Sequence, residues 1–312
     1  MSITRRQLQI SLAVLWLLDG LLQCQPFMFS AEFARRILGP ARDGLPTVLA
    51  LPLHAIAALV AVHPAIANAG FALIQLALGI GLFSRRFARP VLACSIAWAL
   101  MVWVIGEGLG GLVTGLTLLS GAPGGALLYA VIAVIAWPTG DARRDQHPSW
   151  LAIPAWCTLW LTGAGLQLIS ANNSAMSFTM MLRSAQSSAP QWIAAIDRHL
   201  ARMTVPGWLP AALVALCVLV AVWALVPGAT RQLSIAVGAI LAATGWLLFQ
   251  GLGDLTSGQA TDPNSGPLIV LLAVAVASAA QRRAASDERL VDATTPVDEP
   301  CEPKESVAHL YV

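Results

Sequence analysis

Charged side chains are scarce in this sequence of 312 residues. Asp, Glu, Lys and Arg together make up 11% of it, whereas hydrophobic residues make up 57%. A soluble domain usually carries about 25% charged residues, so the composition excludes an ordinary soluble protein and predicts an integral membrane protein whose partner is the lipid bilayer. The net charge is only +2 and no basic tract is interleaved with aromatic residues, which excludes nucleic acid as a partner.

Lysine and paired cysteines are also rare. Lys304 is the only lysine, and the preference for arginine is typical of a GC-rich bacterial genome. The five cysteines form no CxxC pair and show no metal-ligand spacing, so no metal is expected. Most of them lie in apolar runs, where a cysteine behaves as a small hydrophobic residue.

A glycine-rich stretch occurs twice in the chain. Gly106–Gly115 returns as Gln250–Gly258, and Glu107 matches Gln250 at an offset of 143 positions. The flanking matches are Trp16–Gln23 with Trp160–Gln167, at an offset of 144, and Gly125–Leu128 with Gly266–Ile269, at 141. Because the offset changes so little over half the chain, the sequence predicts a tandem duplication.

Apolar segments predict about eight transmembrane helices, four in each half. They cover approximately 8–24, 64–83, 91–105, 124–137, 151–170, 209–226, 233–250 and 267–280. The first resembles a signal peptide, but no cleavage site follows and the segment recurs in the second half, so we expect a retained helix. The predicted fold class is all-α, a polytopic membrane protein with two parallel tandem repeats of a four-helix module. The predicted boundaries are 1–138 and 150–281 for the repeats, 139–149 for a cytoplasmic connector and 282–312 for a disordered cytoplasmic tail.

An amphipathic segment follows the first span of each repeat. Residues 191–203 carry Asp197, Arg198 and Arg202, with apolar residues at helical spacing, which predicts a helix on the membrane surface or over the bundle. The matching residues 46–62 are more apolar. The repeat favours an interfacial or re-entrant helix there, with an extra span left open.

Arginines in the short loops predict the orientation. They are Arg5, Arg6, Arg85, Arg86, Arg89, Arg143, Arg144, Arg231, Arg282 and Arg283. With eight spans they all fall on one side, so both termini are expected in the cytoplasm of a bacterial cell, with the protein in its inner, or plasma, membrane. The glycine-rich stretches and the amphipathic segments then face outward. An even number of spans in each repeat makes the two halves parallel.

The acids in or beside the spans are the first candidates for a polar site, because an unpaired carboxylate in a membrane is costly. They are Asp19, Glu107 and Asp254. Asp19 and Gln23 lie four residues apart, on one helical face, and Gln167 repeats Gln23. Glu107 and Asp254 could instead cap helix ends in water, and Asp19 could make a structural hydrogen bond. The candidate polar site therefore comprises Asp19, Gln23, Glu107, Gln167, Gln250 and Asp254.

The glycines and two histidines have alternative interpretations. The glycines suit close helix packing or a tight turn, and a backbone-lined site for a ligand or quinone headgroup is the alternative. His54 and His199 match at an offset of 145 in the outward segments. They could bind a metal or carry protons, but neither has a second ligand at i+4, which favours interfacial histidines.

Two short motifs mark the first two spans. Arg6 precedes a span that closes Asp19-Gly20-Leu21-Leu22-Gln23, and the next span ends Leu78-Gly79-Ile80-Gly81-Leu82-Phe83-Ser84-Arg85-Arg86. With these motifs, each half resembles a DoxX/DoxD-like four-helix membrane module. Gln23 stands where that family has a lysine. The family includes the membrane subunit of thiosulfate:quinone oxidoreductase, so the resemblance implies thiol, sulfur or quinone redox chemistry, a quinone as the candidate cofactor and a redox protein as partner. It assigns no catalytic residue and leaves open whether the chain is an enzyme. A non-catalytic scaffold or assembly factor and a small-molecule transporter are the alternatives.

Overall fold

The computed structural model describes residues 3–141, 144–169, 171–187 and 189–294, with backbone only at residue 144 and over 280–294. Every regular element in these ranges is a helix, which confirms the predicted all-α class. The long helices of the first half are α1 (Arg5–Leu22), α4 (Pro64–Leu82), α5 (Ala88–Ile105) and α6 (Gly125–Ile135). Those of the second half are α7 (Ala152–Leu168), α10 (Leu209–Trp223), α11 (Ala229–Leu248) and α12 (Ser265–Thr294).

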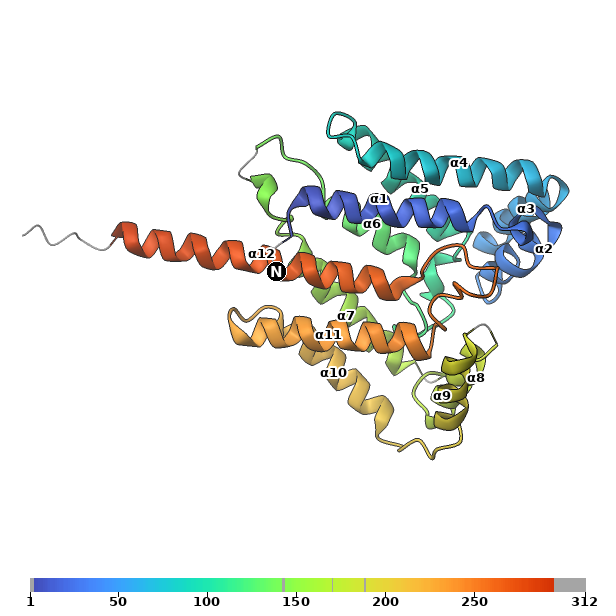
Figure 1. Ribbon diagram of the computed structural model, residues 1–312. Helices are drawn as coiled ribbons and strands as arrows, with labels where there is room; N and C mark the ends of the chain where they lie inside the picture. The colour runs from blue at the N-terminus through green and yellow to red at the C-terminus, as the bar shows by residue number, and fades with distance from the viewer. Residues whose placement is uncertain (1–2, 142–143, 170, 188, 295–312) are drawn as a thin grey trace, which may run out of the picture.

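Shorter helices gather at one end of the bundle, which we call the cap end. They are η1 (Pro26–Phe29), α2 (Ala31–Phe33), η2 (Ala34–Leu38), η3 (Pro40–Arg42), α3 (Thr47–Val62), α8 (Ala175–Ala185) and α9 (Gln191–Leu200). Figure 1 shows α2 and α3 beside the first half and α8 and α9 beside the second, with the N-terminus toward the opposite end. The two amphipathic segments thus lie at the same end, and α8 is an additional helix that the sequence analysis did not predict.

Three helices, α4, α5 and α11, are long and apolar enough to cross a membrane. Shorter apolar helices are Thr47–Val62, Gly125–Ile135, Leu209–Trp223 and the Ser265–Ala279 part of α12. One face of α4 carries Ile66, Leu73 and Ile80, spaced seven residues apart and 76%, 68% and 65% exposed. A continuous apolar stripe of this kind is unfavourable in water but not against lipid.

The helices of the two halves pack in the same order. α1 packs on α4 and α5 on α6, whereas α7 packs on α10 and α11 on α12. One indole hydrogen bond recurs: Trp103 Nε1 donates to the Pro123 carbonyl at 2.8 Å, and Trp246 Nε1, its match at an offset of 143, donates to the Pro263 carbonyl at 2.7 Å. The helices α6, α7 and α12 join the halves, because α12 packs on both of the other two.

Small residues explain the close contact of α1 with α4. A Cβ on Gly20 would lie 2.7 Å from Leu76 Cγ, and one on Gly79 would lie 2.7 Å from Leu17 Cγ. Each glycine therefore receives a leucine of the opposite helix, the packing that small residues permit between apolar helices.

The observed helix ends differ from the predicted ones mainly at α12. Its backbone remains helical to Thr294, past the predicted end at residue 280 and into the segment predicted to be a disordered tail. The remainder of that segment, 295–312, lies outside the described residues, as does Arg143 of the predicted connector.

Candidate functional site

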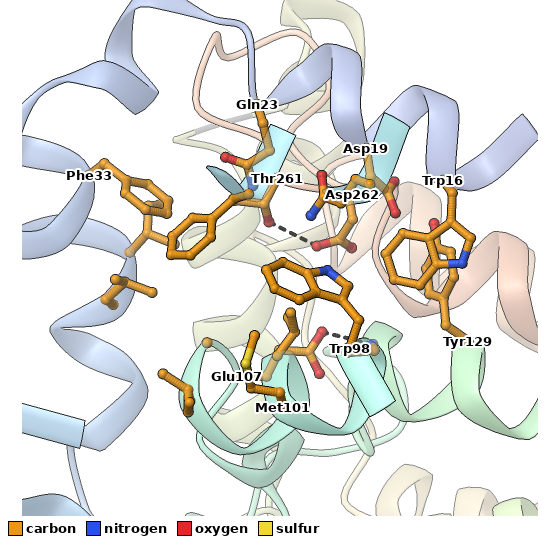
Figure 2. A pocket seen from close by; sticks show the side chains of 18 of the residues that line it. Trp16, Asp19, Gln23, Phe33, Trp98, Met101, Glu107, Tyr129, Thr261 and Asp262 are labelled. Atoms are coloured by element: carbon orange, nitrogen blue, oxygen red, sulfur yellow. Dashed lines mark hydrogen bonds between the residues drawn. The ribbon is translucent and has the colours of Figure 1, made fainter. Parts of the chain in front are cut away.

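A cavity of about 100 Å³ lies at the cap end of the first half. Its lining comes from α1, α2, η2, α3, α4, α5 and α6, together with the start of the first glycine-rich stretch and the loop that precedes α12. The polar residues that line it are Asp19, Gln23, Gln75, Glu107, Thr261 and Asp262, and the aromatic ones are Trp16, Phe33, Phe71, Trp98 and Tyr129 (Figure 2). One water requires roughly 10–15 Å³ by this measure, so the space is large enough for several waters or a ring-sized group.

Glu107 occupies the point where the chain leaves α5. Its Oε1 accepts a hydrogen bond from the backbone N–H of Ala126 at 3.0 Å, which satisfies a free donor in the first turn of α6. Gly124 makes this approach feasible, since a Cβ there would lie 2.1 Å from Glu107 Oε2. Glu107 thus caps a helix end, as one interpretation of the sequence predicted, but its Oε2 is buried rather than in water.

The environment of Glu107 favours its neutral form. Burial raises the pKa of this carboxyl to about 8, and the nearby charge of Asp262 acts in the same direction. The hydrogen bonds from the backbone of Ala126 and Gly125 oppose the shift but do not cancel it. Glu107 is therefore mostly protonated at neutral pH, and can donate a hydrogen bond into the cavity.

Asp262 is a site residue that the sequence analysis missed. Its Oδ1 accepts the backbone N–H of Asn264 at 2.7 Å and its Oδ2 accepts the Thr261 hydroxyl at 2.8 Å, an arrangement typical of the turn before a helix. Burial raises the pKa of Asp262 too. The run Thr261-Asp262-Pro263-Asn264 signals a turn, but only the packing of α12 on α6 brings its carboxyl to a cavity of the first half.

Asp19 and Tyr129 face each other deep in the cavity. Their exposed fractions are 1% and 2%, and the two side chains interact electrostatically. The Tyr129 ring packs against Trp16 with centroids 4.4 Å apart, so the hydroxyl is held at a defined place on the wall. Neither Asp19 Oδ1 nor the Tyr129 hydroxyl makes a hydrogen bond of good geometry with a described residue, and each group is a close polar partner of the other.

Six buried polar atoms without a hydrogen-bond partner in the described ranges belong to residues around this one space. They are Asp19 Oδ1, Gln23 Oε1, Gln75 Oε1, Trp98 Nε1, Glu107 Oε2 and the Tyr129 hydroxyl. More than about 90% of buried polar groups in proteins have a partner, and each unpaired one costs roughly 1–3 kcal/mol. Such a set is complementary to a ligand that offers both donors and acceptors.

The other predicted polar residues lie outside the cavity lining. Gln167 Nε2 donates to the Asn172 carbonyl at 2.8 Å, and Gln250 Nε2 donates to the Leu119 carbonyl at 3.0 Å, so both amides hold loops together. Asp254 lies in the second glycine-rich stretch with φ of 58°. The structure thus brings together Asp19, Gln23 and Glu107 but not Gln167, Gln250 or Asp254.

His54 and His199 are also remote from the cavity lining. They are exposed on α3 and α9, at the cap end. Within the described ranges, no group of three His, Cys, Asp or Glu side chains could hold a metal ion.

The two glycine-rich stretches form tight turns. In the first, a Cβ on Gly110 would lie 1.7 Å from the Pro123 carbonyl oxygen, and in the second, one on Gly253 would lie 2.5 Å from the Pro263 carbonyl oxygen. Both glycines have φ in the left-handed region, at 60° and 67°. Their role is therefore the close backbone approach that glycine allows, and the first turn places Glu107.

Neither a protein-family model, a characterised protein nor a solved structure matches this chain to a significant degree. The resemblance to DoxX-type modules therefore stays a prediction from the sequence.

Proposed function

We propose that this chain is a multi-pass membrane protein of two parallel four-helix repeats that binds a quinone headgroup in the cavity of its first half. The membrane location is supported by the lengths of α4, α5 and α11 and by the apolar stripe on α4. The duplication is supported by the equal packing order of the halves and by the indole hydrogen bond that recurs at Trp103 and Trp246.

The observation that carries the quinone proposal is the combination of aromatic walls with unpaired buried polar atoms. A quinone headgroup is a flat ring with two carbonyl acceptors. Trp98 Nε1 supplies an unpaired donor, the neutral Glu107 carboxyl supplies a second, and the Tyr129 hydroxyl beside Asp19 supplies a third. Aromatic rings pack favourably on such a ligand, and each donor fixes its orientation.

The carboxyls suit the proton exchange that accompanies quinone chemistry. Reduction of a quinone to a quinol consumes two electrons and two protons. Glu107, with a pKa raised to about 8, can deliver and recover protons at neutral pH, and burial raises the pKa of the neighbouring Asp262 carboxyl too. In keeping with the DoxX resemblance, we propose that the electrons come from a thiol or reduced sulfur compound through a redox protein partner.

The apolar tail of a quinone requires a path into lipid. Met101 lines the cavity and is also 38% exposed on the outer surface of α5. Ile56 of α3 and Phe71 of α4 line the cavity as well, so its wall toward α3, α4 and α5 is largely apolar. We propose that the tail leaves at Met101.

The test is a titration of the full chain, in nanodiscs of defined lipid, with a short-tailed quinone, followed by tryptophan fluorescence. We expect saturable quenching, because Trp16 and Trp98 line the cavity. Tyr129→Phe removes only a hydroxyl and should weaken binding by roughly fivefold, the effect of one hydrogen bond of about 1 kcal/mol.

Asp254→Asn is the matched control, because asparagine tolerates the left-handed backbone of Asp254 and this residue does not line the cavity. It should bind like the wild type. Quenching that does not saturate, or equal affinities for Tyr129→Phe and the wild type, would reject the quinone site. Flux of a solute through the reconstituted protein, lost in Asp19→Asn, would favour a transporter instead.

A further inference from the structure

A second cavity, of about 440 Å³, lies at the opposite end of the first half from the cap end. It is formed where the start of α1 meets the loop between α4 and α5 and the segment after α6. Its lining residues are Thr4, Arg5, Arg6, Gln9, Arg85, Ala88, Pro138, Gly140, Asp145 and Gln146. We call it the basic cavity, because three arginines face a single carboxylate.

Two of these arginines are fixed in the wall by the ends of helices. Arg5 is 7% exposed, and it donates through Nε to the His147 carbonyl at 2.9 Å and through Nη1 to the Trp137 carbonyl. Arg6 donates through Nη1 to the Leu82 carbonyl at 2.8 Å and through Nη2 to that of Phe83, at the end of α4. Capping a carbonyl satisfies donors but leaves the positive charge in place.

Gln9 completes the floor of the basic cavity. It is 4% exposed, its Nε2 donates to the Ala136 carbonyl at 3.0 Å, and its Oε1 accepts from Arg6 Nη1 at 3.3 Å. The floor is thus a connected set of hydrogen bonds, so the positions of the charges are defined before any ligand arrives.

Arg85, the third arginine of the basic cavity, does not cap a helix end. Its exposed guanidinium makes no hydrogen bond or ion pair with the residues that the structure describes, and it lies near enough to Arg6 for their charges to repel. The single lining carboxylate, Asp145, lies 3.8 Å from Arg5, and its Oδ1 accepts hydrogen bonds from the backbone and the hydroxyl of Thr139. Positive charge therefore remains in excess.

From this geometry we propose that the basic cavity binds the phosphate of an anionic lipid. Guanidinium groups match phosphate oxygens in geometry and charge, and basic sites between helices on the cytoplasmic side of membranes hold such headgroups. Phe83 and Phe87, on either side of Arg85 in the chain, are 46% and 53% exposed. Exposed rings beside an arginine are suited to the membrane interface, where acyl chains lie next to headgroups. The inference rests on the proposed membrane location but not on the quinone site.

Native mass spectrometry of the full chain tests this, with phosphatidylglycerol and phosphatidylcholine added in turn. We expect retention of phosphatidylglycerol in preference to phosphatidylcholine. Arg85→Gln should weaken phosphatidylglycerol binding by about fivefold, the loss expected for one basic side chain at a membrane surface. Arg86→Gln is the matched control, because Arg86 lies over the Phe87 ring and not in the lining.

Thermal stability with and without inorganic phosphate distinguishes the two sources of the phosphate group. No stabilisation by phosphate, with an Arg85-dependent effect of phosphatidylglycerol, supports the lipid. Stabilisation by millimolar phosphate that is lost in Arg85→Gln, without lipid preference, retains a phosphate site but rejects the lipid. Equal binding of both lipids without a phosphate effect, or equal losses in the Arg85 and Arg86 variants, overturns the proposal. None of these results bears on quinone quenching, so the two proposals fail separately.

Discussion

The same region of the bundle is hollow and polar in the first half but almost filled and apolar in the second. The cavity of about 100 Å³ in the first half contains Trp16, Asp19 and Gln23. At the matching place in the second half, Trp160, Gly163 and Gln167 line a space of about 20 Å³. Leu118 and Leu119 also line that space. If the halves are copies, as we propose, the first has ionisable groups at this place and the second has closely packed apolar side chains.

The packing around the matching positions explains the differences between the two halves. Where the first half has Asp19, the second has Gly163, whose missing Cβ would lie 3.0 Å from Leu118 Cδ2. Where the first has Glu107, the second has Gln250, whose amide is bound by Leu119 and Ser265. A neutral amide can be satisfied by two neighbours inside a protein, whereas a buried carboxylate requires a proton, a cation or water. We therefore propose that the ligand binds in the first half only.

The largest effect is expected from the glycines that shape the two turns. Gly110→Ala would place a Cβ against the Pro123 carbonyl at 1.7 Å, with a left-handed backbone, and should destabilise the protein by roughly 3 kcal/mol or more. Gly253→Ala meets the Pro263 carbonyl at 2.5 Å and should cost less. Resistance to unfolding by sodium dodecyl sulfate measures both. Equal losses of stability in the two variants would show that the first turn is not packed more tightly than the second.

A dependence on pH is expected from the first half. The pKa of Glu107 is raised from 4.5 to about 8 on folding, so the folded protein holds a proton that the unfolded chain releases. The contribution of this proton to the free energy of unfolding is complete below pH 4.5. It is lost as pH rises toward 8, by about 1 kcal/mol per pH unit in that interval. Melting temperatures between pH 5 and 9 should fall in the wild type and change less in Glu107→Gln.

The contrast with the second half is tested by Gln250→Glu in the same series. This substitution places a carboxyl beside the Leu119 carbonyl, and a carbonyl can accept a hydrogen bond but cannot donate one. The variant should lose more stability at high pH than the wild type. Ionisation of the new carboxyl removes the proton that it would donate to the Leu119 carbonyl. A wild-type profile in both variants would show that neither position controls the pH response.

A smaller effect on ligand affinity is expected at Trp98. Trp98→Phe keeps an aromatic wall but removes the unpaired Nε1 donor, and should weaken quinone binding by roughly fivefold. The control in the second half is Trp246→Phe. It removes an Nε1 donor that lies 2.7 Å from the Pro263 carbonyl oxygen. That variant should lose stability but retain affinity for the quinone. An unchanged affinity in Trp98→Phe would show that this indole donor does not bind the quinone.

Much of the fold could be predicted from the sequence, because the apolar lengths and the repeated glycine stretch are local signals. The positions of α4, α5 and α11 agree with predicted spans to within a few residues. The segment that became α8 gave no such signal, since the repeat aligned only 191–203 with the first half. The helical backbone of α12 beyond residue 280 was missed because its polar sequence resembles a solvated tail.

The candidate site was predictable only in part, for a physical reason. Asp19, Gln23 and Glu107 attract attention because acids and amides are costly in apolar helices. Asp262 and Tyr129 do not stand out, since a turn aspartate and a helical tyrosine are common. They become site residues through packing between segments more than a hundred positions apart, as when α12 packs on α6. Periodicity carries no information on such contacts.

The smallest effect is expected where the second half is already packed. Gly163→Ala would bring a Cβ to 3.0 Å from Leu118 Cδ2, a flexible side chain that can retreat by a few tenths of an ångström. Gly165, two residues along the same helix, has open space where its Cβ would be, so Gly165→Ala should gain up to about 1 kcal/mol from helix propensity. Gly163→Ala should lack that gain. If both alanines stabilise the protein equally in thermal melts, Leu118 does not fill the second site, and the contrast between the halves must come from the carboxyls alone.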